Sequence, residues 1–253
     1  MSYLKQRHTQ IILACFLASS LLLFDFPSID LRISQIFYHG GFTLKNQWWA
    51  NFLTSSIGYL ITFALLIVLG LYCFNKLFKR TVCNLCGKKV LYLFLVLIVG
   101  AGLVVNVMLK DNFGRARPRD VEQFGGPKHF TPAFVMTHEC RNNCSFSSGH
   151  GAGAFFALAF AMALSRKRAA LLAAMGFGVL VSLSRITSGA HFFSDTVVSF
   201  FVMLIVSDAL HFLLLSPNSR VIEVAFIAPP THLSPLALQL DETMPSAALA
   251  QMR

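Results

Sequence analysis

The sequence predicts an all-α protein built as a bundle of six transmembrane helices, with its functional residues gathered at the outer, periplasmic face of the membrane. Three observations predict this fold. The 253 residues are 55% hydrophobic and only 13% charged, whereas soluble domains are about 45–50% apolar and about 25% charged. The mean hydropathy is +0.64, and six apolar stretches approach the roughly 20 residues that a membrane-spanning helix needs. These features argue against a soluble enzyme and against a chain that is disordered over most of its length.

The six expected spans are residues 11–26, 57–74, 90–109, 152–164, 169–186 and 196–215. The fourth is short unless it begins near Gly149. The first has an alternative interpretation as a signal peptide because Lys5 and Arg7 precede it, although no small-x-small cleavage site follows cleanly. The length fits one domain, so residues 1–215 are expected to form an integral membrane domain. Residues 216–253 are rich in Pro and Ser and are expected to form a disordered cytoplasmic tail.

Basic residues mark the side of the membrane that faces the cytoplasm. They gather at ends expected on one side, at Lys5, Arg7, Lys76, Lys79, Arg80, Lys88, Lys89, Arg166, Lys167 and Arg168. The opposite side then holds residues 27–56, 110–151 and 187–195. The loop 110–151 breaks the rule with the basic residues Lys110, Arg115, Arg117, Arg119, Lys128 and Arg141. A bound anion and a solvated loop with acidic partners both explain this excess.

Three polar clusters fall at the outer ends of expected spans. The first, 110–118, reads Lys-Asp-Asn-Phe-Gly-Arg-Ala-Arg-Pro, and the second, 147–150, reads Ser-Ser-Gly-His. The third, 184–195, contains Arg185, His191 and Asp195. Under the expected topology all three clusters share one membrane face, so they can converge on one site.

The clusters contain the side chains that a phosphoryl group needs. Lys110, Arg117 and Arg185 are three cations, and Arg presents forked donors that suit phosphate oxygens. Ser148 and the backbone N–H of Gly149 lie where a helix begins, which is an anion-binding position. Taken singly, these features are also typical of interfacial anchors, stop-transfer flanks and helix caps.

Two histidines and one carboxylate complete a reactive set. His191 and Asp195 are four residues apart, so on a helix they share one face. A carboxylate bonded to one ring nitrogen fixes the tautomer and leaves the other nitrogen as a nucleophile. His150 is a second imidazole that can protonate a leaving oxygen and later activate water. This set requires no metal and no cofactor, although a helix-terminal His–Asp pair without chemistry has the same spacing.

The spacing resembles the three-part signature of the type 2 phosphatidic acid phosphatase superfamily. The matching strings are Lys110-x6-Arg117-Pro118, the Ser-Gly-His that ends at His150, and Ser184-Arg185-x5-His191-x3-Asp195. The resemblance implies that His191 is the phosphorylated nucleophile, Asp195 its partner and His150 the acid and base. It also implies phosphate ligands at Lys110, Arg117, Ser148, Gly149 and Arg185.

One departure and one finer likeness accompany the signature. Family members open the second motif with Pro where this chain has Ser147, a change that removes no reacting group. The segment 140–150, Cys-Arg-Asn-Asn-Cys-Ser-Phe-Ser-Ser-Gly-His, is similar to bacterial members that act on lipid A phosphates. The resemblance therefore implies a multi-pass phosphatase of the bacterial inner membrane that hydrolyses a lipid phosphate or pyrophosphate through a phosphohistidine, with its active site facing the periplasm.

The expected partners are an anionic phospholipid or lipid A-type substrate and the surrounding membrane lipids, with lipid A phosphate favoured. The alternatives are a lipid phosphotransferase of the same fold and a phosphatase of undecaprenyl pyrophosphate or phosphatidylglycerol phosphate. A non-enzymatic binder of lipid phosphates is a further alternative. The net charge of +10 also suggests nucleic acid, but the basic residues alternate with spans and form no single stripe.

The six cysteines divide between the two sides of the membrane. Cys140 and Cys144 would lie on the oxidising outer side of a bacterial envelope, where both a disulfide and free thiols are compatible with the sequence. Cys83 and Cys86 have the spacing of half a zinc site, but no second pair lies on their side. We therefore expect free thiols at the other positions, which are Cys15, Cys73, Cys83 and Cys86.

Overall fold

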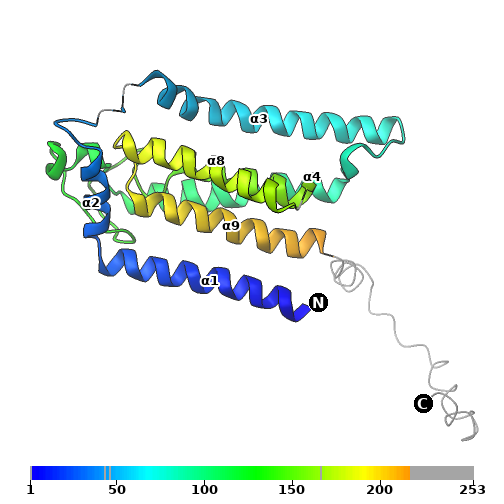
Figure 1. Ribbon diagram of the computed structural model, residues 1–253, viewed down its shortest axis with the longest axis horizontal. Coiled ribbons are helices and arrows are strands. Elements are labelled where there is room, and N and C mark those ends of the chain that lie inside the picture. The colour runs from blue at the N-terminus through cyan, green and yellow to red at the C-terminus, as the bar shows by residue number, and fades with distance from the viewer. Residues whose placement is uncertain (1, 43, 46, 166, 217–253) are drawn as a thin grey trace, which may run out of the picture. The chain divides into compact units, whose positions relative to one another are not determined.

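The computed structural model describes residues 2–42, 44–45, 47–165 and 167–216, and this part of the chain is helical (Figure 1). Within these ranges there is no strand, and the only β pairing is two isolated bridges, Tyr38 with Phe42 and Val121 with Lys128. The all-α prediction is therefore confirmed. The predicted disordered tail lies outside the described residues, apart from Ser216.

Each of the six apolar stretches is helical. α1 (Ser2–Asp25), α3 (Trp48–Leu77), α8 (Arg168–Thr187) and α9 (Phe193–Leu215) cover four of them. α4 (Gly87–Leu95) runs on into the π-helix η2 (Val96–Lys110) and covers a fifth. The remaining stretch forms α6 (Gly149–Phe155), α7 (Ala157–Phe160) and η5 (Ala161–Ser165).

Not every helix meets the length of a membrane span on its own. By length and composition, four stretches do so, namely Trp48–Leu77, Gly87–Asp120, Arg168–Thr187 and Phe193–Leu215. A fifth is the pair Thr9–Asp25 and Ser28–Ile36, bent by 84°. Gly149–Ser165 is a shorter apolar helix, as expected for the fourth predicted stretch. The chain is thus a multi-pass membrane protein whose spans match the predicted positions, although the count of six is approximate.

The short helix α6 lies inside the bundle, where it packs against α3, α8, α9 and η2. Its sequence, Gly-His-Gly-Ala-Gly-Ala-Phe, permits this position because small residues let helices approach closely. A Cβ at Gly153 would lie 2.8 Å from Ile57 Cγ2, and one at Gly178 on α8 would lie 2.1 Å from Phe155 Cδ1. Both glycines are therefore needed for the close packing around α6.

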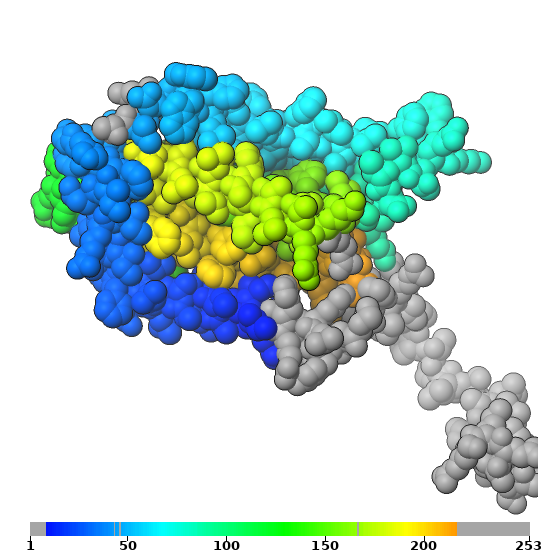
Figure 2. All heavy atoms as spheres, viewed as in Figure 1, coloured from blue at the N-terminus to red at the C-terminus, as the bar shows by residue number. Residues whose placement is uncertain are grey.

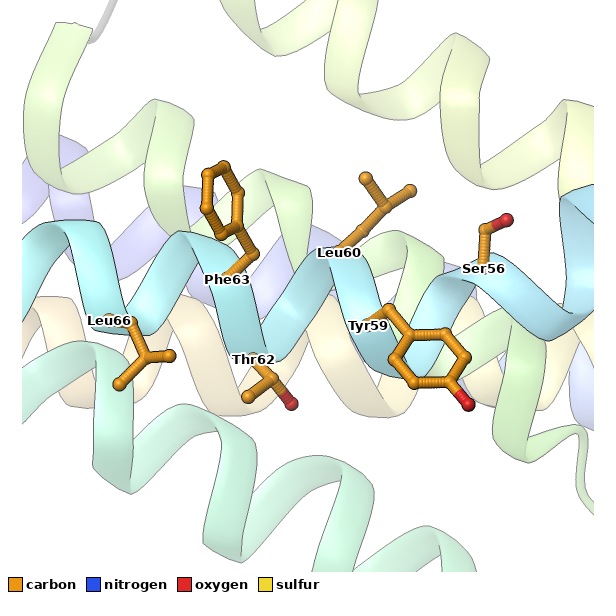
Figure 3. Close-up of a pocket in the computed structure, with 6 residues that line it drawn as sticks. All are labelled: Ser56, Tyr59, Leu60, Thr62, Phe63 and Leu66. Atoms are coloured by element: carbon orange, nitrogen blue, oxygen red, sulfur yellow. The ribbon is translucent and has the colours of Figure 1, made fainter.

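The outside of the bundle is apolar. Parts of α1, α3 and α8 form the face of the bundle seen in Figure 2. Large exposed hydrophobic side chains follow these helices, among them Leu17, Phe63 and Leu180. Figure 3 shows six side chains of α3 that border an open region of the surface: Ser56, Tyr59, Leu60, Thr62, Phe63 and Leu66. Such a surface suits the hydrocarbon core of a bilayer, where apolar side chains meet lipid at no cost.

The two ends of the bundle differ in charge. α2 (Ser28–Ile36) crosses one end at an angle to α1, and the connection between α3 and α4 lies at the other end (Figure 1). The far end carries basic residues such as Lys79, Arg80 and Lys88. Residues 111–148 fold against the α2 end, hereafter called the site end. A small apolar core holds them there, made of Phe42, Ala116, Val121, Phe124 and Phe192.

Candidate active site

The three polar clusters meet at the site end of the bundle. One backbone hydrogen bond joins two of the clusters directly, and two more join one cluster to a residue that flanks another. The bonds run from Ser145 N–H to Arg115 O (2.9 Å), from Ser148 N–H to Asp195 O (3.3 Å) and from Arg119 N–H to Gly189 O (3.1 Å). Side chains that are up to 85 residues apart in sequence are thus fixed relative to one another, as the convergence predicted from topology requires.

His191 lies in the connection between α8 and α9 and is only 1% exposed. Its Nδ1 lies 2.8 Å from the carbonyl oxygen of Ser145, so this nitrogen carries the proton and donates it. Asp195 Oδ2 lies 3.6 Å from the same nitrogen. Nε2 is buried and has no hydrogen-bond partner among the described residues. The ring therefore keeps an uncommitted lone pair on Nε2, which is the requirement for a nucleophilic nitrogen.

The protonation state of His191 follows from its surroundings. Burial lowers the pKa of His191 from 6.5 to about 4, and this effect outweighs the opposing hydrogen bond and charge of Asp195. The charges of Arg185 and Arg117 act in the same direction as burial. The imidazole is therefore neutral at neutral pH, and its Nε2 is available without prior loss of a proton.

Asp195 lies in the first turn of α9 and is completely buried. Its Oδ1 accepts a hydrogen bond from Arg115 Nη1 at 2.6 Å. Its Oδ2 accepts from the backbone N–H of Phe192 at 2.8 Å and from the hydroxyl of Ser145. Because both oxygens are held, the carboxylate cannot rotate away from His191. Ser145 also orients the ring, since its carbonyl oxygen accepts a hydrogen bond from the Nδ1–H of His191.

Three cations form a second set, here called the cation cluster: Lys110, Arg117 and Arg185. A Cβ at Gly149 would lie 3.7 Å from Lys110 Nζ, so the start of α6 borders this set. Arg117 donates from Nε and Nη2 to the carbonyl of Asn143, at 3.2 and 2.7 Å. The Nε of Arg185 is buried and lacks a partner among the described residues. Within the described part of the chain, none of the three forms an ion pair with a carboxylate.

The members of the cation cluster are close enough to act on one another and on both histidines. Lys110 interacts electrostatically with Arg117 and Arg185. All three cations act on His150, which is half-buried in the first turn of α6. Like charges left together without counter-ions repel, so this arrangement suits an anion that supplies the missing negative charge.

Ser148 occupies the position before α6 and caps it. Its side chain is fully buried and accepts a hydrogen bond from the backbone N–H of Gly151 at 3.2 Å. Ser199 donates to the carbonyl of Ser148 at 2.9 Å and so fixes this corner to α9. The structure therefore brings Ser148, Gly149 and His150 to the same end of the bundle as the other predicted site residues.

The sequence analysis assigned no role to Arg115 or Asp30. Arg115 is 1% exposed and bonds to both Asp30 and Asp195. Its guanidinium also lies 4.3 Å from the centre of the Phe192 ring. Arg115 lies two residues before Arg117, and this position could have indicated a role in the site. A buried carboxylate such as Asp195 needs a positive partner, and Arg115 is that partner. Asp30 lies in no motif, and nothing in the sequence indicated it.

Cys140 and Cys144 form a disulfide, with their Cα atoms 5.5 Å apart. The bridge closes the loop that precedes Ser145, whose carbonyl holds His191. The other four cysteines are free and exposed, at Cys15, Cys73, Cys83 and Cys86.

Comparison with known proteins points to one family. The family model described as the PAP2 superfamily matches residues 89–214. A lipid A 4'-phosphatase of Francisella tularensis subsp. novicida (strain U112) is 34% identical over 199 residues, which cover 74% of this chain and 86% of that protein. A lipid A 4'-phosphatase of Rhizobium etli is 30% identical over 205 residues, which cover 73% of this chain and 79% of the relative.

A third relative covers less of both chains. The lipid A 4'-phosphatase of Rhizobium leguminosarum is 37% identical over 116 residues, or 45% of this chain and 50% of that protein. No solved structure matches the chain.

Proposed function

This chain belongs to the PAP2 superfamily, and from that premise we propose that it is a membrane phosphatase that releases phosphate from a lipid, with lipid A as the favoured substrate. The observation that carries the proposal is the Nε2 of the neutral His191 ring, which has no hydrogen-bond partner in the described part of the chain. It lies at the end of the bundle where three cations gather without an ion pair in that part. The relatives named lipid A 4'-phosphatase support the choice of substrate.

The first half of the reaction transfers a phosphoryl group to His191. Lys110, Arg117 and Arg185 hold the phosphate oxygens together with Ser148 and the N–H of Gly149, and their charge balances the charge of the transition state. Nε2 attacks phosphorus in line, the N–P bond forms and the P–O bond to the lipid breaks. His150 protonates the departing oxygen. The Nδ1 proton stays on the ring, held by the carbonyl of Ser145.

The second half returns the enzyme to its starting state. His150, now without its proton, takes one from a water molecule that attacks phosphorus. The N–P bond breaks, inorganic phosphate leaves, and Nε2 recovers its lone pair. Asp195 stabilises the positive charge that the His191 ring carries while it is phosphorylated.

The proposal of a lipid substrate is supported by an apolar cavity of about 420 Å³. α2, α8 and α9 line it with side chains such as Ile33, Val179, Leu183 and Phe200. Ile186, which follows Arg185 in the chain, also lines the cavity, so the cavity reaches the end of α8 that carries Arg185. An acyl chain can occupy this cavity while the phosphate lies among the cations, because apolar walls with a few polar groups at one end are typical of ligand sites.

We place the protein in the bacterial inner membrane with its site facing the periplasm. The basic residues at the opposite end of the bundle support this orientation through the positive-inside rule. A reporter fused within residues 126–128 tests it, because a periplasmic loop activates an alkaline phosphatase fusion. Activity of a cytoplasmic reporter at that position would contradict the orientation.

The test of the function is a panel of purified lipids incubated with the detergent-solubilised full chain. The panel contains lipid A, undecaprenyl pyrophosphate, phosphatidylglycerol phosphate and phosphatidic acid, and free phosphate is measured. We expect the fastest release from lipid A, and we expect EDTA to leave the rate unchanged. Faster release from another lipid would change the substrate, and a newly phosphorylated lipid in place of free phosphate would indicate a phosphotransferase. No product from any lipid would contradict the proposed function.

A further inference from the structure

Beneath His191 lies a second group of charges, here called the ion triad: Asp30, Arg115 and Asp195. Arg115 bonds through Nη1 to Asp195 Oδ1 at 2.6 Å and through Nη2 to Asp30 Oδ2 at 2.8 Å. None of the three side chains is more than 1% exposed. One guanidinium therefore lies between two carboxylates from different helices, with no solvent to weaken their interaction.

Asp30 comes from α2, which crosses the end of the bundle and lies outside the region 89–214 that the family model matches (Figure 1). Besides the bond from Arg115, it accepts a bond from the backbone N–H of Ser194 at 2.8 Å and one from the Ser194 hydroxyl. Burial disfavours the charged form of Asp30, but all of these partners donate to its oxygens, which favours the charged form. With both carboxylates ionised, the ion triad carries one net negative charge.

The sign of this charge bears on the chemistry of the neighbouring ring. His191 is neutral before the reaction and positive once phosphorus is bonded to Nε2, because its Nδ1 proton remains. If Arg115 faced Asp195 alone, the two charges would cancel, and little field would remain to stabilise the ring. Asp30 engages the second edge of Arg115, so the negative charge of Asp195 is not cancelled.

We infer that Asp30 is a positioning residue for phosphoryl transfer, which acts through Arg115 to leave a net negative charge beside His191. The inference rests on the proposed function. A purely mechanical alternative exists, in which Asp30 only fastens α2 to α9 through Ser194 and Arg115. The two accounts make different predictions once the charge of Arg115 is also removed.

The test compares four forms of the full chain: wild type, Asp30→Asn, Arg115→Gln and the double variant with both changes. The net charges of the ion triad are then −1, 0, −2 and −1. The probe is lipid A carrying ³²P-labelled phosphate in detergent micelles. The readout is the rate constant for appearance of alkali-stable label on the protein, which is typical of phosphohistidine, measured per folded enzyme in a single turnover.

We expect Asp30→Asn to slow labelling roughly 10- to 100-fold while KM changes little, because the lost charge acts on the transition state. The double variant restores the net charge and should label faster than Asp30→Asn. Ser34→Ala is the matched control, since Ser34 is also buried on α2, one turn further along. It should label at the wild-type rate.

Three results would overturn the inference. The first is a labelling rate constant of Asp30→Asn equal to that of the wild type. The second is a double variant whose labelling rate constant is no higher than that of Asp30→Asn. If Asp30→Asn does not fold, the double variant still decides, because its ion triad carries the same net charge as that of the wild type. A rate constant more than about 100-fold below that of the wild type in the folded double variant would favour the mechanical account. A wild type that takes up no label would instead contradict the proposed function.

Discussion

The charges at the site end form two sets with opposite surroundings. In the ion triad, Arg115 lies between two carboxylates and all three side chains are hydrogen-bonded. In the cation cluster, three positive side chains share one region without an ion pair among the described residues. A buried charge costs free energy unless it is paired. The comparison therefore assigns different tasks: the ion triad keeps a paired, net negative group beside His191, and the cation cluster awaits a ligand whose charge completes it.

Removal of a cation from the cluster should give the largest effect on catalysis. We expect Arg185→Ala to lower kcat/KM for lipid A by roughly 10²- to 10³-fold, because it removes donors to the charge of the transition state. Its melting temperature in detergent should stay the same or rise, since repulsion within the cluster is relieved. Arg168→Ala, at the other end of α8, is the control. Loss of both activity and stability in Arg185→Ala would contradict the distinction between the cation cluster and the ion triad.

Removal of the cation of the ion triad should act on stability first. Arg115→Met leaves Asp30 and Asp195 as unpaired buried carboxylates, so the free energy of unfolding should fall by about 3 kcal/mol or more. Thermal unfolding of the purified protein measures this loss. Arg185→Met, a change of the same size in the other set, is the reference. Equal stability of the two variants would show that the sets do not differ as described.

The pH dependence of labelling tests the protonation state of the nucleophile, His191, which lies between the two sets of charges. Burial lowers the pKa of His191 to about 4, and only the neutral ring has a lone pair on Nε2. Protonation of His191 should therefore lower the rate of phosphoenzyme formation only near pH 4, whereas protonation of His150, the acid of this step, should not lower the rate as pH falls. Rapid acid-range assays with circular dichroism as a folding control check this. If the labelling rate instead fell by half near pH 6.5, the ordinary pKa of histidine, burial would not determine the pKa of His191.

The smallest expected effect concerns the apolar cavity. Val179→Trp fills space between α8 and α2, whereas Leu180→Trp places the same ring on the exposed face of α8, outside the cavity lining. We expect Val179→Trp to lower kcat/KM for a long-chain lipid several-fold, by about 1 kcal/mol, but to spare a short-chain phosphate ester. Leu180→Trp should change neither. Equal losses with both substrates would remove the cavity from lipid binding.

Much of the fold and the reacting residues could be predicted from sequence because they depend on local patterns. Apolar runs indicate membrane helices wherever they occur. The positions of Arg185, His191 and Asp195 follow from one short segment at a helix connection. Topology then brings the three clusters to one face without knowledge of any contact.

The remainder depends on contacts that leave no local pattern. The bond between Asp30 and Arg115 joins residues 85 positions apart, and one aspartate in an amphipathic helix resembles any solvated residue. Ser145 holds His191 through a backbone carbonyl, which every residue type possesses. The bend of 84° between α1 and α2 brings Asp30 to the site, and it too becomes evident only in three dimensions.

The central claim is that His191 takes the phosphoryl group while the cation cluster holds it. The most direct measurement is mass spectrometry of the quenched protein after a single turnover on lipid A. The account predicts a phosphoryl group on His191 in the wild type, and neither label nor phosphate release in a folded His191→Ala variant. Continued phosphate release by His191→Ala would contradict it.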